Sequence, residues 1–137
     1  MSIIDFSEEQ SMLLETANEF CRENSTISVV RAQIDKEESV DGELWSRIVE
    51  LGWLGVSIPE TYGGLGMGLA GAVPIVESMG KYLMGSPYTS CILTAEVILS
   101  CASEEQKNQW LPKIIEGSVA TLSLIHISEP TRPLYIS

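Results

Sequence analysis

The 137-residue sequence contains a single histidine, His126, and only three cysteines, which are Cys21, Cys91 and Cys101. These cysteines lack the C-x-x-C spacing that is typical of zinc and redox sites, so neither a metal site nor a disulfide framework is expected. A Ser-His-Asp or Cys-His catalytic set would depend on His126, near the C-terminal end. The sequence therefore predicts no metal site and no such catalytic set.

Basic residues are also scarce, with 8 Lys and Arg against 19 Asp and Glu, which gives a formal net charge of -11. A negative field of this size repels the phosphates of nucleic acids and the anionic surfaces of membranes. We therefore expect no nucleic acid partner and no membrane partner.

Long apolar runs are missing as well. The most apolar stretch, residues 88–102, is interrupted by Thr89, Glu96 and other polar residues and is too short to span a bilayer. The first ten residues carry Asp5, Glu8 and Glu9 where an export signal would carry basic and apolar regions. The predicted location is cytoplasmic.

Helical periodicity is what the sequence does contain. Two S-x-x-Q capping boxes, at residues 7–10 and 103–106, each precede apolar residues at helical spacing. Helical spacing also predicts four further helices, in residues 27–38, from Asp41 to Gly52, in residues 69–82 and after Pro87. The predicted fold class is all-α, a helical bundle of about six helices.

Two features interrupt this helical pattern. Residues 54–68 include five glycines and Pro59, which predicts a structured loop. Pro74 lacks the N–H group that a helix interior needs, so it should begin or kink the helix in which it lies.

Three residue patterns allow a chemical interpretation and a structural one. Residues 66–71 match the G-x-G-x-x-G dinucleotide fingerprint, but no strand is predicted before them. Three glutamates near apolar residues, Glu60, Glu77 and Glu96, could act as general bases, because burial raises the pKa of a carboxyl. Roles as helix caps or solvated surface groups are favoured for all three. Core packing is favoured over ligand stacking for the three tryptophans, Trp45, Trp53 and Trp110.

A family resemblance rests on residues 51–66, LGWLGVSIPETYGGLG. This stretch resembles the "elGwlgl-x-x-P-E-x-y-G-G-x-G" segment of the acyl-CoA dehydrogenases. FSEEQ at residues 6–10 resembles the start of the family, and EEQKNQWLPK at residues 104–113 resembles its "eeqk-x-x-wLp" helix. The matches run in the family's order from Ile4 to about Leu122.

The resemblance implies a three-domain enzyme, with an N-terminal helical domain, a middle β-domain and a C-terminal four-helix bundle. Residues 1–121 match the first domain alone, so the chain is expected to be a fragment of a larger protein. In the family, FAD accepts a hydride from the β-carbon of an acyl-CoA while a glutamate removes the α-proton. The flavin contacts and this base come chiefly from the other domains, so no catalytic and no cofactor-binding residue is assigned here.

The resemblance also implies partners for the complete protein: an acyl-CoA substrate, an electron-transfer flavoprotein and further copies of itself in a homo-oligomer. The fragment by itself is expected to be inactive. Two alternatives remain open, namely an acyl-CoA oxidase-like flavoenzyme on the same scaffold and a free-standing helical interaction module without flavin.

One substrate site carries over from the family, because its helix before "eeqk" lines part of the fatty-acyl pocket. An ungapped alignment from residues 104–107 places this site at Thr89, Ser90 and Leu93. Helix packing and capping next to Pro87 is the alternative explanation for these three residues.

The last segment, residues 122–137, loses all periodicity. Residues 122–132 resemble, position by position, the translation of a common transposase sequencing adapter. Ser128, Glu129 and Pro130 are similar to the start of the family's flavin-side "T-E-P-x-a-G-S-D" signature, but the glycine and the Ser-Asp pair do not follow. Residues 122–137 are therefore expected to be a non-native, disordered tail.

Overall fold

The computed structural model describes residues 5–36 and 41–120. Within these ranges it contains helices and no strand, which confirms the predicted all-α class of about six helices. The α-helices are α1 (Glu8–Asn24), α2 (Ile27–Asp35), α3 (Gly42–Glu50), α4 (Gly68–Lys81), α5 (Tyr88–Cys101) and α6 (Glu104–Ile115). Two single 3-10 turns follow α3: η1 (Trp53–Gly55) starts one residue before the predicted loop, and η2 (Glu60–Tyr62) lies within it. The predicted tail, residues 122–137, lies outside the described residues.

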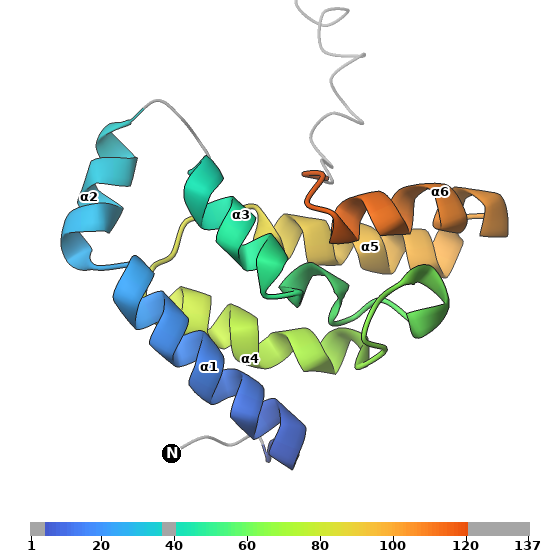
Figure 1. Ribbon diagram of the computed structural model, residues 1–137, viewed down its shortest axis with the longest axis horizontal. Coiled ribbons are helices and arrows are strands. Elements are labelled where there is room, and N and C mark those ends of the chain that lie inside the picture. Colours follow the sequence, from blue (N-terminus) through green and yellow to red (C-terminus); the bar gives the residue numbers. More distant parts are fainter. Residues whose placement is uncertain (1–4, 37–40, 121–137) are drawn as a thin grey trace, which may run out of the picture.

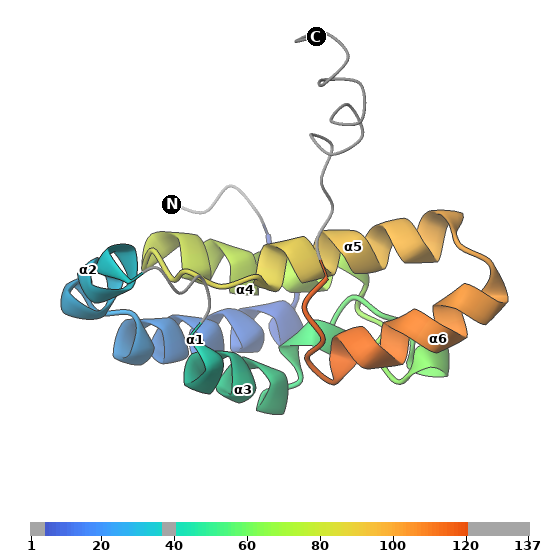
Figure 2. The same cartoon turned by 90° about the horizontal axis from the view of Figure 1, so that it is seen from above.

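The helices form two layers. Helices α4 and α5 run along one side of the molecule, while α1, α3 and α6 run along the other (Figure 2). Helix α1 packs along α4, and α5 packs on both α4 and α6 (Figure 1). Helix α2 lies at one end and buries none of its side chains. The longest helices therefore build the core, and no described helix covers the outer surface of the α4–α5 layer.

The helices begin where the sequence places their caps. Ser7 and Ser103 each form a complete capping box, with Gln10 and Gln106 as the respective partners. The side chain of Asp41 accepts hydrogen bonds from the first backbone N–H groups of α3, as predicted. Because such caps pair N–H groups that have no partner inside the helix, each contributes about 1 kcal/mol.

Trp53 joins the two layers. Its ring meets the ring of Phe20 on α1 edge-on, with the centroids 5.1 Å apart. Its backbone carbonyl accepts a hydrogen bond of 3.0 Å from the hydroxyl of Tyr88, which is fully buried at the start of α5. A buried Tyr hydroxyl needs such a partner, so the contact fixes the start of α5 against η1.

The loop before α4 is folded back on itself by backbone hydrogen bonds. Gly66 donates to the carbonyl of Ile58 at 2.9 Å, and Met67 donates to that of Val56 at 3.0 Å. A Cβ atom on Gly64 would lie 1.9 Å from the Ile58 carbonyl oxygen, so only glycine fits there. The predicted structured loop is confirmed, and its glycines permit close backbone packing.

Pro74 does not begin a helix, because α4 starts six residues earlier and carries Pro74 in its interior. A proline leaves the carbonyl four residues before it without its helical donor. Here that carbonyl belongs to Ala70, and the side-chain amide of Gln10 on α1 donates to it at 3.2 Å. The Oε1 atom of Gln10 also accepts from the backbone of Ser7, so one side chain caps α1 and compensates Pro74 on α4.

Each helix within the described ranges falls short of the length and apolar character that crossing a bilayer requires. Those ranges also hold no group of three or more His, Cys, Asp or Glu residues arranged to bind a metal ion. The cytoplasmic location stays a prediction.

The double role of Gln10 predicts that Gln10→Glu destabilises the chain by about 1 kcal/mol in urea unfolding. Glutamate still accepts the hydrogen bond from Ser7 but has no N–H to give to Ala70. Gln106→Glu is the matched control, because Gln106 occupies the same position in the second capping box and donates to no carbonyl of the residues that the structure describes. Equal effects of the two substitutions would contradict the role of Gln10 in compensating Pro74.

Candidate functional site

The site that best fits a ligand of apolar character is a groove between α4 and α5. It has a volume of about 450 Å³, which is within the range of small-molecule sites. Its lining is almost entirely aliphatic: Leu69, Ala72, Val73, Val76, Ile92 and Leu93, with Glu77 and Thr89 as the polar members. We call it the α4–α5 groove.

Two of the three predicted substrate residues line this groove, and the third does not. Thr89 and Leu93 lie one helical turn apart on α5 and both face the α4–α5 groove. Ser90 is absent from the lining and half-buried, and its carbonyl accepts a hydrogen bond of 2.8 Å from the hydroxyl of Thr94. The structure thus brings Thr89 and Leu93 together with α4 and places Ser90 beside the groove.

The wall that α4 supplies was missed at the level of sequence. Leu69, Val73 and Val76 follow one another at spacings of four and three residues, which puts them on one helix face. That spacing predicts a shared face but gives no sign that the face meets α5. Leu69, Val73 and Leu93 remain 44%, 37% and 50% exposed, so the groove is open toward solvent in the described chain.

The groups with shifted pKa values all lie outside the α4–α5 groove. Burial raises the pKa of the Cys21 thiol to about 11, and burial also raises the pKa of Cys91 and of Tyr88. A hydrogen bond of 2.7 Å from the hydroxyl of Tyr62 lowers the pKa of Glu104, and Lys107 lowers it further. These groups are buried and neutral, or fully exposed on a polar surface, and none is placed as an acid or base for a ligand in the groove.

The other candidates from the sequence take up structural or surface positions. Glu77 lies at the edge of the α4–α5 groove, whereas Glu60 and Glu96 do not line it. Trp45 and Trp53 are buried, as predicted. Trp110 is 46% exposed, so the prediction that it packs in the core is wrong. Leu111 and Ile114 are the buried residues of α6, and Trp110 lies on the outer side of the helix.

The glycine fingerprint at residues 66–71 does not form a phosphate cradle. The segment before it is the 3-10 turn η2, and no strand exists in the described residues to complete a dinucleotide-binding unit. A Cβ atom on Gly71 would lie 2.5 Å from the Cβ of Met67 and 3.0 Å from Val56, so this glycine allows tight packing of α4 on the loop. The described residues therefore do not fit a flavin or a nucleotide at this point.

With this geometry in place, comparison with known proteins identifies the family. The sequence model described as "Acyl-CoA dehydrogenase, N-terminal domain" matches residues 7–118. The chain belongs to the acyl-CoA dehydrogenase family. The match covers all six α-helices and ends just after α6, and it confirms the resemblance stated from the sequence.

Two curated relatives are named for acyl-CoA chemistry. Acryloyl-CoA reductase (NADH) of Anaerotignum propionicum is 31% identical over 134 residues, which cover 95% of this chain and 33% of that protein. Mitochondrial isovaleryl-CoA dehydrogenase of Bos taurus is 30% identical over 129 residues, or 90% of this chain and 29% of that protein. The chain spans about a third of the length of these relatives.

A solved structure agrees with the sequence relatives. The steroid ACAD Tcur3481-Tcur3483 superimposes with a TM-score of 0.75 at 30% sequence identity, covering 81% of this chain and 30% of that chain. The fold of the described residues is therefore one that is known from experiment.

The open apolar lining of the α4–α5 groove predicts that the neutral dye Nile red binds there with enhanced fluorescence. Leu93→Asp should weaken this binding about tenfold, because a carboxylate would have to lose its hydration against the aliphatic walls. Leu83→Asp is the control, since Leu83 is 70% exposed and does not line the groove. Unchanged binding to Leu93→Asp, or an equal loss with Leu83→Asp, would rule out the groove as the dye site.

Proposed function

We propose that this chain is the substrate-side helical domain of a flavin-dependent enzyme that introduces an α,β double bond into an acyl-CoA thioester. Its specific task is to form one wall of the pocket that holds the acyl group. The observation that carries the proposal is the meeting of Thr89 and Leu93 with the aliphatic face of α4.

The chemistry of the α4–α5 groove suits an acyl chain. Six of its eight lining residues are aliphatic, and an acyl chain gains roughly 25 cal/mol for each Å² that such a surface removes from water. Thr89 and Glu77 are the two polar members, and both belong to the end where α4 finishes and α5 begins. An apolar ligand therefore fits along the groove, with polar groups at one end only.

The exposure of the groove supports a role within a larger assembly of domains. Leu69, Val73 and Leu93 are each more than a third exposed. Exposed apolar surface of this kind usually marks a binding site or an interface. A second wall on the solvent side would close the groove into a pocket. We propose that the second wall belongs to the other domains of the enzyme.

The cofactor of the proposed enzyme is FAD, which supplies the hydride acceptor when it is bound. The described residues do not form a site for it, since the glycines of residues 66–71 pack internally and no strand accompanies them. The flavin site and the catalytic base are therefore assigned to other parts of the enzyme, and this chain by itself should be inactive. The electron acceptor proposed for the complete enzyme is an electron-transfer flavoprotein, and the proposed assembly is a homo-oligomer.

Two variants of this proposal use the same groove. An acyl-CoA oxidase would pass electrons to oxygen, and a reductase such as the Anaerotignum relative is named for the reverse direction. Assays in both directions, with and without an electron-transfer flavoprotein, distinguish them. A free-standing helical module without flavin is the alternative from a different class.

The test is Leu93→Trp in the full-length flavoenzyme. The larger side chain fills part of the α4–α5 groove, so KM for a long acyl-CoA should rise about tenfold while kcat with a short acyl-CoA stays unchanged. Leu83→Trp is the matched control outside the groove. The 137-residue chain, purified alone, should show no flavin absorbance and no acyl-CoA-dependent dye reduction.

Identical acyl-length profiles for wild type and Leu93→Trp would contradict the role of the groove. Flavin bound to the isolated chain would contradict the assignment of the flavin site to other domains. If no acyl-CoA changed the absorbance of flavin in the full-length protein, the free-standing module would replace the enzyme as the explanation.

A further inference from the structure

A second cavity lies on the other side of α5. It has a volume of about 400 Å³ and is enclosed by α5, α6 and residues 118–120. The segment after α6 turns back toward α5 (Figure 2), and the backbone N–H of Ala120 lies 3.4 Å from the sulfur of Cys91 on that helix. We call this space the α5–α6 cavity. No residue of the α4–α5 groove lines it.

The body of the α5–α6 cavity is apolar. Ile98 comes from α5, Ala102 directly follows that helix, Ile114 comes from α6, and Val119 closes the space from the segment after α6. Val119 and Trp110 are 50% and 46% exposed, so the mouth of the cavity is open. A ligand with an apolar body gains from burial here.

Two side chains that line the α5–α6 cavity offer N–H donors, and the hydroxyl of Ser118 can donate or accept. The hydroxyl of Thr94 is already bonded to the carbonyl of Ser90. The Oε1 atom of Gln106 accepts from the backbone of Ser103, which leaves the N–H groups of its amide. Lys113 adds an ammonium group with three donors and no acceptor. A ligand with an anionic acceptor group therefore suits Lys113 and the Gln106 amide.

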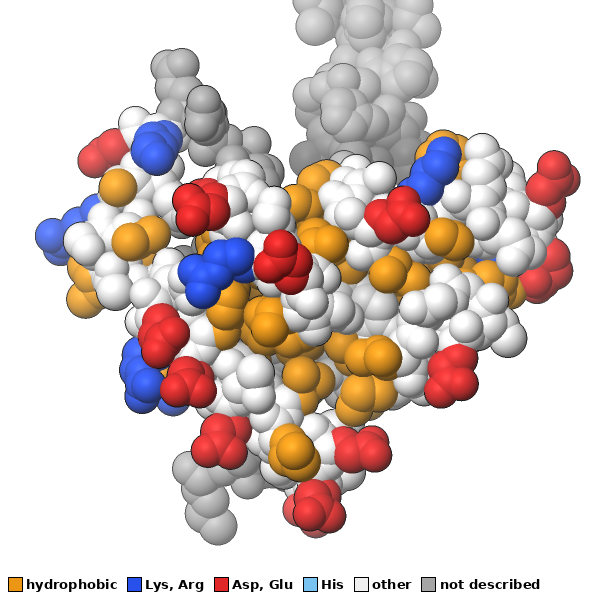
Figure 3. All heavy atoms as spheres, viewed as in Figure 1, with side chains coloured by type: hydrophobic (Ala, Val, Ile, Leu, Met, Phe, Trp, Pro, Cys, Tyr) orange, Lys and Arg blue, Asp and Glu red, His pale blue; other side chains and the backbone are white. Residues whose placement is uncertain are grey.

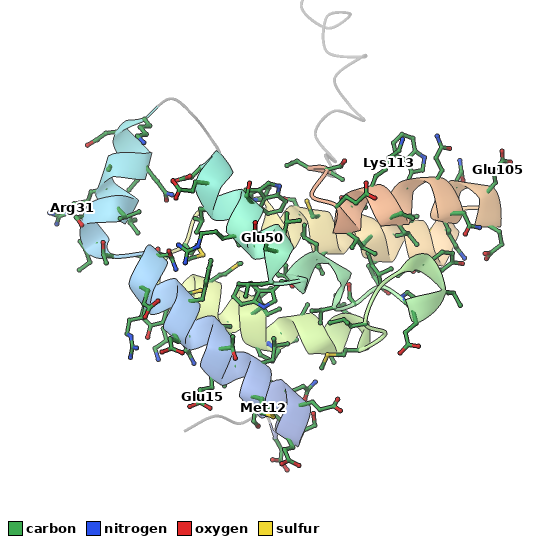
Figure 4. The ribbon with its side chains drawn as sticks, in the orientation of Figure 1. Met12, Glu15, Arg31, Glu50, Glu105 and Lys113 are labelled. Carbon is green, nitrogen blue, oxygen red and sulfur yellow. The ribbon has the colours of Figure 1, made fainter. Side chains whose placement is uncertain are left out.

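Charge distinguishes this cavity from the rest of the molecule. Acidic side chains dominate the surface, as the red groups around the edge of Figure 3 show, yet no Asp or Glu of residues 5–36 and 41–120 lines the α5–α6 cavity. The Lys113 ammonium lies 4.7 Å from the centroid of the Trp110 ring and forms no ion pair within the described part of the chain. Glu105 lies at the opposite end of α6 (Figure 4). Glu116 follows Lys113 by three residues but does not line the cavity, so Lys113 is the one charged side chain among the described lining residues.

We propose that the α5–α6 cavity binds a small amphiphile that carries one carboxylate on an apolar body. The carboxylate pairs with Lys113 at the mouth, and the apolar body lies against Ile98, Ile114 and Val119. The long-range field of the acidic chain opposes an anion, but at physiological salt it is screened beyond about 8 Å, so the nearby ammonium dominates. This site is independent of the acyl groove and of the proposed enzyme activity.

Decanoate is the probe, titrated into the full 137-residue chain while the indole N–H resonance of Trp110 is followed by NMR. Trp110→Phe assigns that resonance among the three tryptophans. Decanoate should shift it saturably, and decyltrimethylammonium, with the opposite charge on the same tail, should not. Lys113→Met keeps the aliphatic stem but removes the charge, so it should weaken decanoate binding about tenfold.

Lys107→Met is the matched control, because Lys107 is on the same helix but pairs with Glu104 and does not line the cavity. It should bind decanoate as the wild type does. The proposal is overturned if the Trp110 resonance shows no saturable shift, or if Lys113→Met and Lys107→Met behave alike. It is also overturned if Leu93→Asp weakens decanoate binding while Lys113→Met does not, because decanoate would then occupy the α4–α5 groove.

Discussion

The hydrogen bond from the Tyr88 hydroxyl to the Trp53 carbonyl is the contact on which the arrangement of the helices depends. It joins two fully enclosed groups, and neither has water as a substitute partner. The Trp53 carbonyl also accepts from the backbone N–H of Val56, so breaking the bond would leave the buried Tyr88 hydroxyl as the unpaired group, which costs about 1–3 kcal/mol. Because Trp53 also meets Phe20 on α1, this one turn determines where α5 lies relative to the opposite layer.

The position of α5 in turn shapes both the α4–α5 groove and the α5–α6 cavity. Thr89 directly follows Tyr88, and Leu93 lies one turn later, so fixing the start of α5 directs both residues to the face of α4. The opposite face of the same helix carries Thr94 and Ile98 into the α5–α6 cavity. A helix held at its first residue thus separates an aliphatic groove from a cavity with donor groups. The two hollows differ in charge because α4 contributes Glu77 and α6 contributes Lys113.

Local chemistry made much of this fold predictable from the sequence. The caps at Ser7, Asp41 and Ser103 act on backbone groups within three residues, so their presence in the sequence is enough to place the helix starts. The contact of Gln10 with Ala70 joins residues 60 positions apart, and nothing in the sequence indicates it. Pro74 was for this reason expected to begin or kink α4, whereas a donor from α1 allows the helix to continue through it.

The site was predictable in part for the same reason. Family resemblance pointed to Thr89, Ser90 and Leu93, but helical spacing could not show that Ser90 lies outside the groove or that Leu69, Val73 and Val76 face it. These facts depend on how α4 and α5 pack. Photolabelling of the full-length flavoenzyme with an acyl-CoA that carries a diazirine at the acyl terminus tests the central claim. The account predicts labels within residues 69–77 and 89–93, and labels found only outside these segments would contradict it.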